Sequence, residues 1–234
     1  MITLCQFTDK PVWGINPSPF CMKVETYLRL TGLPYQTKSC LPNQAPKGKL
    51  PFIIEDDGRL IPDSGVIIEH LEATRGHLLD GSLTLEQQSL GHLIRRTCEE
   101  NLFFVIAYSR WFDEPGWSIL KPLFFGNIPI PIRWIVPGLI RRRIRRDLIG
   151  QGILRHNREE IYALGCKDIR ALAGLLGNRS FFVTDHTPSS VDVCVYSFLV
   201  NIIRPPVDSP LKYFIKQHDN LVSFISRIDK LLET

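Results

Sequence analysis

The sequence lacks the cysteine pattern of an exported, disulfide-stabilised protein. Its six cysteines, at positions 5, 21, 40, 98, 166 and 194, show no paired spacing. A chain of 234 residues with 44% hydrophobic content can close its core without disulfides, as one large domain or two modest ones. We therefore expect a reducing, cytoplasmic environment.

Long apolar runs are also missing, and we expect no export leader. The first ten residues have no basic patch followed by an apolar stretch and a small-residue cleavage site, so they predict a strand. The most apolar region, residues 119–140, is interrupted by Lys121 and Arg133. Its longest uncharged run, residues 122–132, is well short of the ~20 residues that a spanning helix needs.

Metal and nucleotide sites have no support in the residue spacing. The six histidines are not spaced as metal ligands, and no glycine-rich phosphate loop is present. We expect neither a metal nor a nucleotide cofactor.

Acidic residues are almost absent from one stretch of the chain. Residues 118–158 carry nine basic side chains and only Asp147 as an acid, net +8, whereas residues 1–80 carry 8 basic and 9 acidic side chains. The basicity is therefore one local patch, centred on Arg141 to Arg146 and preceded by apolar residues such as Trp134.

Apolar residues beside clustered arginines suit an anionic membrane surface, but most charge runs lie on solvated helix faces. We expect the solvated face, because Pro129, Pro131 and Pro137 should prevent one long amphipathic helix from carrying Ile128 to Arg146. No nucleic acid partner is expected, because the rest of the chain supplies no basic field.

The first 76 residues predict a β-α-β-ββ-α order. Ser18 is a good N-cap, Pro19 suits a first helical turn, and Gly32 stops the helix. Asp57-Gly58 is a strong hairpin signal. The predicted elements are a strand at Ile2–Phe7, a helix from Ser18 to Gly32, a strand at Tyr35–Ser39, a hairpin at residues 50–61 and a helix from Ser64 to Gly76.

Strand signals nearly vanish after about residue 85, and helical patterns dominate. They cover residues 85–111, 139–177, 191–203 and 211–232, with an irregular, proline-rich piece at 113–138 between them. The expected organisation is a thioredoxin-like domain at 1–76, a linker at 77–84 and an all-helical domain at 85–234.

Ser18-Pro19-Phe20-Cys21 opens the first predicted helix, directly after a strand and loop. In glutaredoxin-type sites this position is Cys-Pro-aromatic-Cys, where free amides and the helix dipole stabilise a thiolate. Serine at the first position removes the attacking sulfur but leaves a hydroxyl that can donate to the thiolate of a bound thiol. Taken alone, the motif is equally that of an N-cap followed by a small buried residue.

The expected interaction energies are large enough for Ser18 and the helix N-terminus to stabilise a thiolate. Bringing a thiol from a pKa of ~8.5 to below neutrality requires about 2.7 kcal/mol. A charge-assisted hydrogen bond supplies ~1.5 to 3 kcal/mol and a helix N-terminus ~0.3 to 1.

Two further motifs follow along the chain. Leu50-Pro51 enters a predicted strand, where a cis bond would expose the Leu50 backbone to an extended peptide, although base rates favour trans. Asp63-Ser64 opens the next helix, where Ser64 can hold a carboxylate and Asp63 an ammonium. Each motif viewed alone is an ordinary strand or helix start.

Together, and in this order, the three motifs resemble the glutathione site of the glutathione transferase superfamily. Thr187 to Asp192 resembles the N-capping box of that family's helical domain, with Ser189 as the cap. The resemblance covers nearly the whole chain, and residues 18–28, 47–53 and 67–72 look closest to the failed-axon-connections and metaxin-like branch. It implies that Ser18 contacts the glutathione sulfur, that Leu50 and Pro51 present backbone to its cysteinyl unit, and that Asp63 and Ser64 bind its γ-glutamyl group.

The function that this resemblance implies is a cytoplasmic, dimeric glutathione transferase of detoxification, in which glutathione attacks an apolar electrophile. The alternative is a non-catalytic binding or scaffold protein on the same fold, peripheral to membranes if the basic patch binds lipid. The wall of the second-substrate site would come from aromatic side chains that a core helix would equally show, namely Trp13, Tyr108, Trp111, Phe112 and Trp117.

Overall fold

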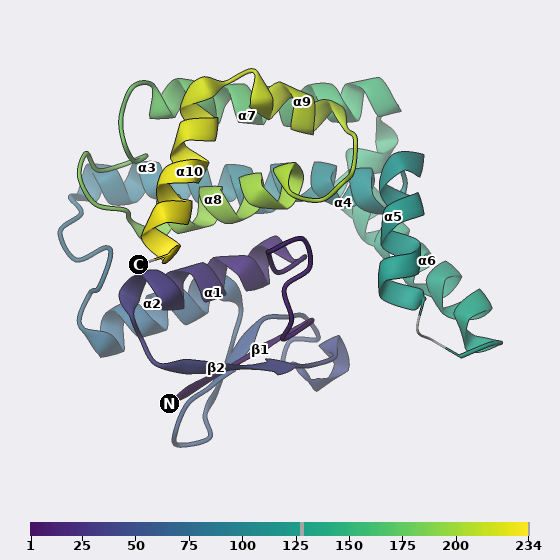
Figure 1. Ribbon diagram of the computed structural model, residues 1–234, viewed down its shortest axis with the longest axis horizontal. Coiled ribbons are helices and arrows are strands. Elements are labelled where there is room, and N and C mark those ends of the chain that lie inside the picture. The colour runs from purple at the N-terminus through teal and green to yellow at the C-terminus, as the bar shows by residue number, and fades with distance from the viewer. Residues whose placement is uncertain (127–128, 234) are drawn as a thin grey trace.

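The computed structural model describes residues 1–126 and 129–233. Its first half contains a four-stranded sheet in the order β2-β1-β3-β4 (Figure 1). β1 (Ile2–Gln6) is parallel to β2 (Tyr35–Ser39), and β3 (Phe52–Ile54) is antiparallel to both β1 and β4 (Leu60–Pro62). With α1 (Pro19–Thr31) and α2 (Ser64–Arg75), this confirms the expected thioredoxin-like β-α-β-ββ-α order.

The core of this half lies between the sheet and the two helices. Leu4 and Ile53 of the sheet pack against Val24 and Tyr27 of α1 and Ile67 of α2, and all five are fully buried. The helix ends follow the sequence: Ser18 caps α1, and Gly32, with φ of 66°, ends it in the left-handed conformation that glycine tolerates.

The second half is helical and packs on the opposite side of α1 from the sheet (Figure 1). Its central helix is α8, whose side chains are buried almost throughout. The bounds are α3 (Leu85–Arg96), a π-helical segment (Thr97–Leu102), α4 (Phe103–Trp111), α5 (Glu114–Phe125), α6 (Ile132–Gln151), α7 (Arg158–Leu176), α8 (Ser190–Ile203), α9 (Pro210–Lys216) and α10 (Asp219–Glu233), with short 3-10 turns at Pro42–Gln44 and Ile153–Arg155.

The capping box at the start of α8 is confirmed. The amide and hydroxyl of Ser189 donate to Asp192 at 2.8 and 2.6 Å, and Asp192 also accepts from the amide of Phe182. The long pattern at 139–177 is two helices rather than one, because Gly152, with φ of 110°, ends α6 and Asn157 caps α7.

The expectation of an irregular segment at 113–138 is wrong. Pro115 lies in the first turn of α5 and Pro131 directly precedes α6, positions where a proline starts a helix rather than breaks it. Pro137 lies inside α6, which continues through it to Gln151. One helix therefore carries Ile132 to Arg146, and the expectation that prolines prevent such a helix is wrong for these residues. Ile128 lies outside the described residues.

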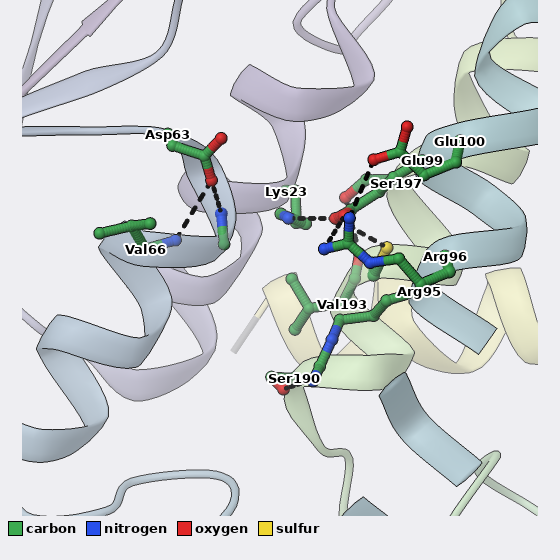
Figure 2. Close-up of polar contacts among 12 residues, drawn as sticks. Lys23, Asp63, Val66, Arg95, Arg96, Glu99, Glu100, Ser190, Val193 and Ser197 are labelled. Atoms are coloured by element: carbon green, nitrogen blue, oxygen red, sulfur yellow. Dashed lines mark hydrogen bonds and ion pairs between the residues drawn. The ribbon is translucent and has the colours of Figure 1, made fainter. Parts of the chain in front are cut away.

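One buried ion pair joins the two halves. Nζ of Lys23 on α1 lies 2.5 Å from Oε1 of Glu99 in the π-helical segment, and the side chains are only 1% and 9% exposed (Figure 2). Arg96 lies 3.5 Å from the other Glu99 oxygen. A buried charge is expensive without its partner, so this pair fixes the position of α1 on the helical half.

We expect Glu99→Gln to lower the free energy of unfolding by about 3–5 kcal/mol, because it leaves the Lys23 ammonium buried without a carboxylate. Lys23→Met should cost less, since Arg96 still neutralises Glu99. Urea unfolding measures both. Glu100→Gln, which breaks an exposed pair with Arg96, is the control and should cost at most about 0.5 kcal/mol. An equally small effect of Glu99→Gln would contradict the role given to the pair.

Candidate functional site

Three of the motifs predicted from sequence meet at one end of the sheet. Phe52 pairs with Cys5 near the end of β1 and with Pro62 at the end of β4. Leu50-Pro51, directly before β3, and Asp63-Ser64, directly after β4, are therefore neighbours. The Leu50-Pro51 peptide bond is cis, as expected for such a site.

Ser18 reaches the same region from the loop that follows β1. Its side-chain oxygen accepts from the amide of Cys21 at 3.4 Å, and its own amide donates to Oδ1 of Asn16 at 3.1 Å. Cys21 belongs to the small buried cluster that contains Leu50 and Phe52, so the first turn of α1 and the Leu50-Pro51 corner pack together. The Ser18 hydroxyl is half-buried, and its oxygen, not its proton, is used by the cap.

The neighbouring thiol is not activated. Burial raises the pKa of Cys21 to about 12, although the Ser18 hydroxyl and the backbone of Phe7 counter the shift by hydrogen bonding. A fully buried thiol with this pKa is inert at neutral pH. The serine hydroxyl is thus the polar group that this turn offers to a ligand.

Asp63 caps α2 with an unusual backbone. Its φ is 79°, a left-handed conformation that is rare outside glycine, and its Oδ1 accepts from the amides of Gly65 and Val66 at 2.9 and 3.2 Å (Figure 2). Such a conformation costs of order 1–3 kcal/mol and clusters at functional sites. Asp63 is exposed, whereas Ser64 beside it is buried.

The loop before Ser18 is clamped by the helical half. Arg110 of α4 donates to the carbonyl of Pro17 at 2.5 Å and to the carbonyl and side-chain oxygens of Asn201 on α8 at 2.6 and 2.9 Å. Asn201 in turn donates to the carbonyl of Asn16 at 3.3 Å. Burial lowers the pKa of Arg110 to about 10, so it remains charged at neutral pH.

Comparison with known proteins identifies the family of this fold. The model of the glutathione S-transferase N-terminal domain matches residues 19–116, and that of the C-terminal domain matches residues 165–228. The isoprene-epoxide glutathione S-transferase of Rhodococcus sp. (strain AD45) is 32% identical over 98% of this chain and 98% of its own length. The chain belongs to the glutathione S-transferase family.

Two further relatives show the branch within the family. Failed axon connections of Drosophila melanogaster is 30% identical over 97% of this chain and 57% of its own length. Metaxin-1 of Mus musculus is 27% identical over 92% of this chain and 71% of its own length. The resemblance to the failed-axon-connections and metaxin-like branch is confirmed.

A solved structure agrees with the fold. The glutathione S-transferase of Ceriporiopsis subvermispora in complex with glutathione superposes with a TM-score of 0.68 at 17% identity, covering 98% of this chain and 97% of that one. The glutathione S-transferase fold therefore extends over the whole described chain.

The aromatic residues predicted for a second-substrate wall pack mainly on one another. Trp111 stacks on Phe124 and tilts against Trp117, which is buried, and Arg141 of α6 lies 4.5 Å over Trp117 and 5.3 Å over Phe112. Tyr108 packs edge-on against Tyr162 of α7. Trp13 is half-buried in the loop before Ser18, with φ of 57°. These contacts are typical of a core, so the wall stays a prediction.

Sequence inspection missed Arg110 and Asn201, the residues that position Ser18 from the helical half. Arg110 is 93 positions from Pro17, and Asn201 is 185 positions from Asn16. Each lies inside a helical pattern, which carries no information about a distant partner. Among residues 1–126 and 129–233, no group of three histidine, cysteine or acidic side chains is arranged to hold a metal ion.

We expect Arg110→Gln to loosen the Asn16–Ser18 backbone, because it removes the charged donor to Pro17. Hydrogen exchange of the Ser18, Cys21 and Met22 amides should accelerate at least about tenfold, with about 2 kcal/mol lost from stability. Arg158→Gln is the matched control: it breaks a comparable two-bond contact, at 2.8 and 2.9 Å to Asp113, away from the site. Equal exchange in the two variants would refute the clamp.

Proposed function

We propose that the chain is a glutathione transferase in which Ser18 stabilises the thiolate of bound glutathione. The observation that carries the proposal is a half-buried serine beside an inert cysteine in the first turn of α1. The protein offers no activated sulfur in this turn, so glutathione supplies the thiol for the chemistry. Ser18 donates one hydrogen bond, and the amides at the start of α1 add their dipole.

The residues at the end of the sheet fit the rest of glutathione. The exposed Asp63 carboxylate offers Oδ2 to the γ-glutamyl ammonium while Oδ1 caps α2. Ser64 and the N-terminal amides of α2 suit the neighbouring carboxylate. The Leu50 backbone, directly before Pro51, pairs with the extended cysteinyl unit. Donors and acceptors of the right sign thus lie in the order that the peptide requires.

The second substrate is an apolar electrophile. The relative from Rhodococcus is named for isoprene epoxide, which supports a small epoxide as one class of substrate. The apolar wall of its site would come from Trp13, in the loop before Ser18, and from Tyr108, Trp111, Phe112 and Trp117, at α4 and α5. A cytoplasmic homodimer that removes reactive compounds is the biological form that we propose.

A second candidate is a binding or scaffold protein that keeps the fold without turnover. Failed axon connections and metaxin-1, neither of which is named as a transferase, support it. Such a protein would keep the Lys23–Glu99 pair and the Arg110 clamp, because both serve the fold. Glutathione affinity separates the candidates: a wild-type chain that gives no heat with glutathione in calorimetry is the scaffold.

Asp63→Asn tests the γ-glutamyl site. Asparagine caps a helix as well as aspartate, so the melting temperature should hold, but loss of the charge should weaken glutathione binding by about tenfold. Isothermal titration calorimetry measures the affinity. Glu69→Gln, the same charge change at an exposed position on α2, should leave affinity unchanged. If Asp63→Asn binds like the wild type, the γ-glutamyl group lies elsewhere.

Ser18→Ala tests the thiolate donor. The pKa of bound glutathione thiol should rise by about one to two units, because a charge-assisted hydrogen bond of ~1.5–3 kcal/mol is lost. Turnover with a chlorodinitrobenzene should fall at least tenfold while affinity holds, since Ser18 contacts only the sulfur. Ultraviolet titration of the bound thiolate gives the pKa, and Ser18→Thr, which keeps a hydroxyl, should restore most of the effect. Unchanged turnover in Ser18→Ala would assign the role to another donor.

A further inference from the structure

We propose that the outer face of α6 docks the protein onto an anionic lipid surface. The outer face is defined here as Ile132, Ile135, Leu139, Arg142, Arg143 and Arg146. The inference is independent of glutathione binding and replaces the expectation of a simply solvated helix.

α6 has an inner side that anchors it to the molecule. Pro137, Arg141, Ile144 and Leu148 recur at spacings of four, three and four residues, and all four are buried or half-buried. Val136 and Ile140, at the border of this side, are also half-buried. Arg141 donates to the carbonyl of Trp111 at 3.0 Å and covers the rings of Phe112 and Trp117. One arginine of the basic run is therefore structural and unavailable to a partner.

The opposite side is exposed and carries two kinds of residue. Ile132, Ile135, Leu139, Arg142 and Arg146 recur at spacings of three and four, so they share one side of the helix. Leu139 is 60% exposed, Ile135 59% and Ile132 51%. Large apolar side chains gathered at this exposure on one helix mark an interaction site rather than an ordinary surface.

The two kinds of residue are separated along the helix. The apolar residues occupy its first two turns, which together with α5 stand at one end of the molecule, outside the sheet and the central helices (Figure 1). The arginines of the outer face follow in the next turns, while Arg133, in the first turn, donates to the carbonyl of Gly126. Ile135 and Arg142 are seven residues apart, about 10 Å along the axis.

The mixture of apolar residues and arginines on this face suits the interfacial region of a bilayer. Apolar side chains of interfacial helices lie about 5–10 Å into the boundary between headgroups and acyl chains, while arginines remain at the anionic headgroups. An exposed tryptophan near the apolar end is suited to the same region. No helix within the described part of the chain is long and apolar enough to span a bilayer, so the contact proposed is peripheral.

A second copy of the chain fits this face less well. In a two-fold symmetric contact the face meets itself, so the interface encloses Arg142, Arg143 and Arg146 of both copies with no acidic residue of the face to pair them. A nucleic acid would use the arginines but leave Ile135 and Leu139 exposed to water. A lipid surface would contact both the apolar residues and the arginines of the outer face.

The test is co-sedimentation of the full chain with vesicles of phosphatidylcholine containing 30% phosphatidylserine, compared with phosphatidylcholine alone. We expect binding to the anionic vesicles that fades between 50 and 500 mM salt. Arg142→Gln/Arg143→Gln/Arg146→Gln should lower the partition coefficient by about a hundredfold, from about fivefold per arginine. Ile132→Ser/Ile135→Ser/Leu139→Ser should also release the protein from the vesicles.

Two matched control variants distinguish the contribution of this face from effects of overall charge and hydrophobicity. Lys167→Gln/Lys216→Gln/Lys230→Gln removes the same charge from other exposed helix positions, and Leu41→Ser/Leu85→Ser/Leu93→Ser removes exposed leucines elsewhere. Both should bind like the wild type, and circular dichroism should show all four variants folded. No binding of the wild type, or equal loss in the controls, would overturn the proposal. So would a serine variant that dissociates a dimer in sedimentation velocity while its vesicle binding is unchanged.

Discussion

The contact between the helical half and the loop before Ser18 is the constraint on which the candidate site depends. A hydrogen bond from a serine to a thiolate weakens steeply with poor geometry, so the hydroxyl must be held in place. Asn201 donates to the carbonyl of Asn16, and Arg110 donates to the carbonyl of Pro17. The Asn16 side chain in turn accepts a hydrogen bond from the Ser18 amide. The thioredoxin-like half supplies the serine, but the helical half determines where it lies.

Contacts between the two halves explain how the fold can persist with or without catalytic turnover. Lys23, Glu99 and Arg110 are buried or partly buried charges whose partners cross between the halves, and losing either partner is costly whatever the protein does. Ser18 and Asp63 differ, because they lie at the surface of the site and only cap helices. The proposed activity therefore rests on residues whose other role is to cap a helix, and a fold of this kind can serve both enzymes and scaffolds.

Local chemistry could be predicted from the sequence, and distant contacts could not. The N-cap at Ser18, the capping box at Ser189 and the stop at Gly32 are decided by neighbouring residues, and the structure agrees. The Lys23–Glu99 pair spans 76 positions and the Arg110–Pro17 bond spans 93, and no periodicity signals either. The prolines at 115 and 131 were misinterpreted for a related reason: whether a proline starts or breaks a helix depends on its place within the helix.

α6 shows a form of amphipathic helix that ordinary pattern analysis overlooks, because its exposed apolar residues and arginines share one side and are separated along the axis. The orientation of this helix is tied to the site by adjacent residues of α4. Arg141 bonds the carbonyl of Trp111, and Arg110, one position earlier, holds Pro17 before Ser18. A lipid surface docked on α6 would thus face the molecule in one orientation relative to the site. Apolar electrophiles partition into lipid, so an enzyme held there would meet its substrate where the substrate is concentrated.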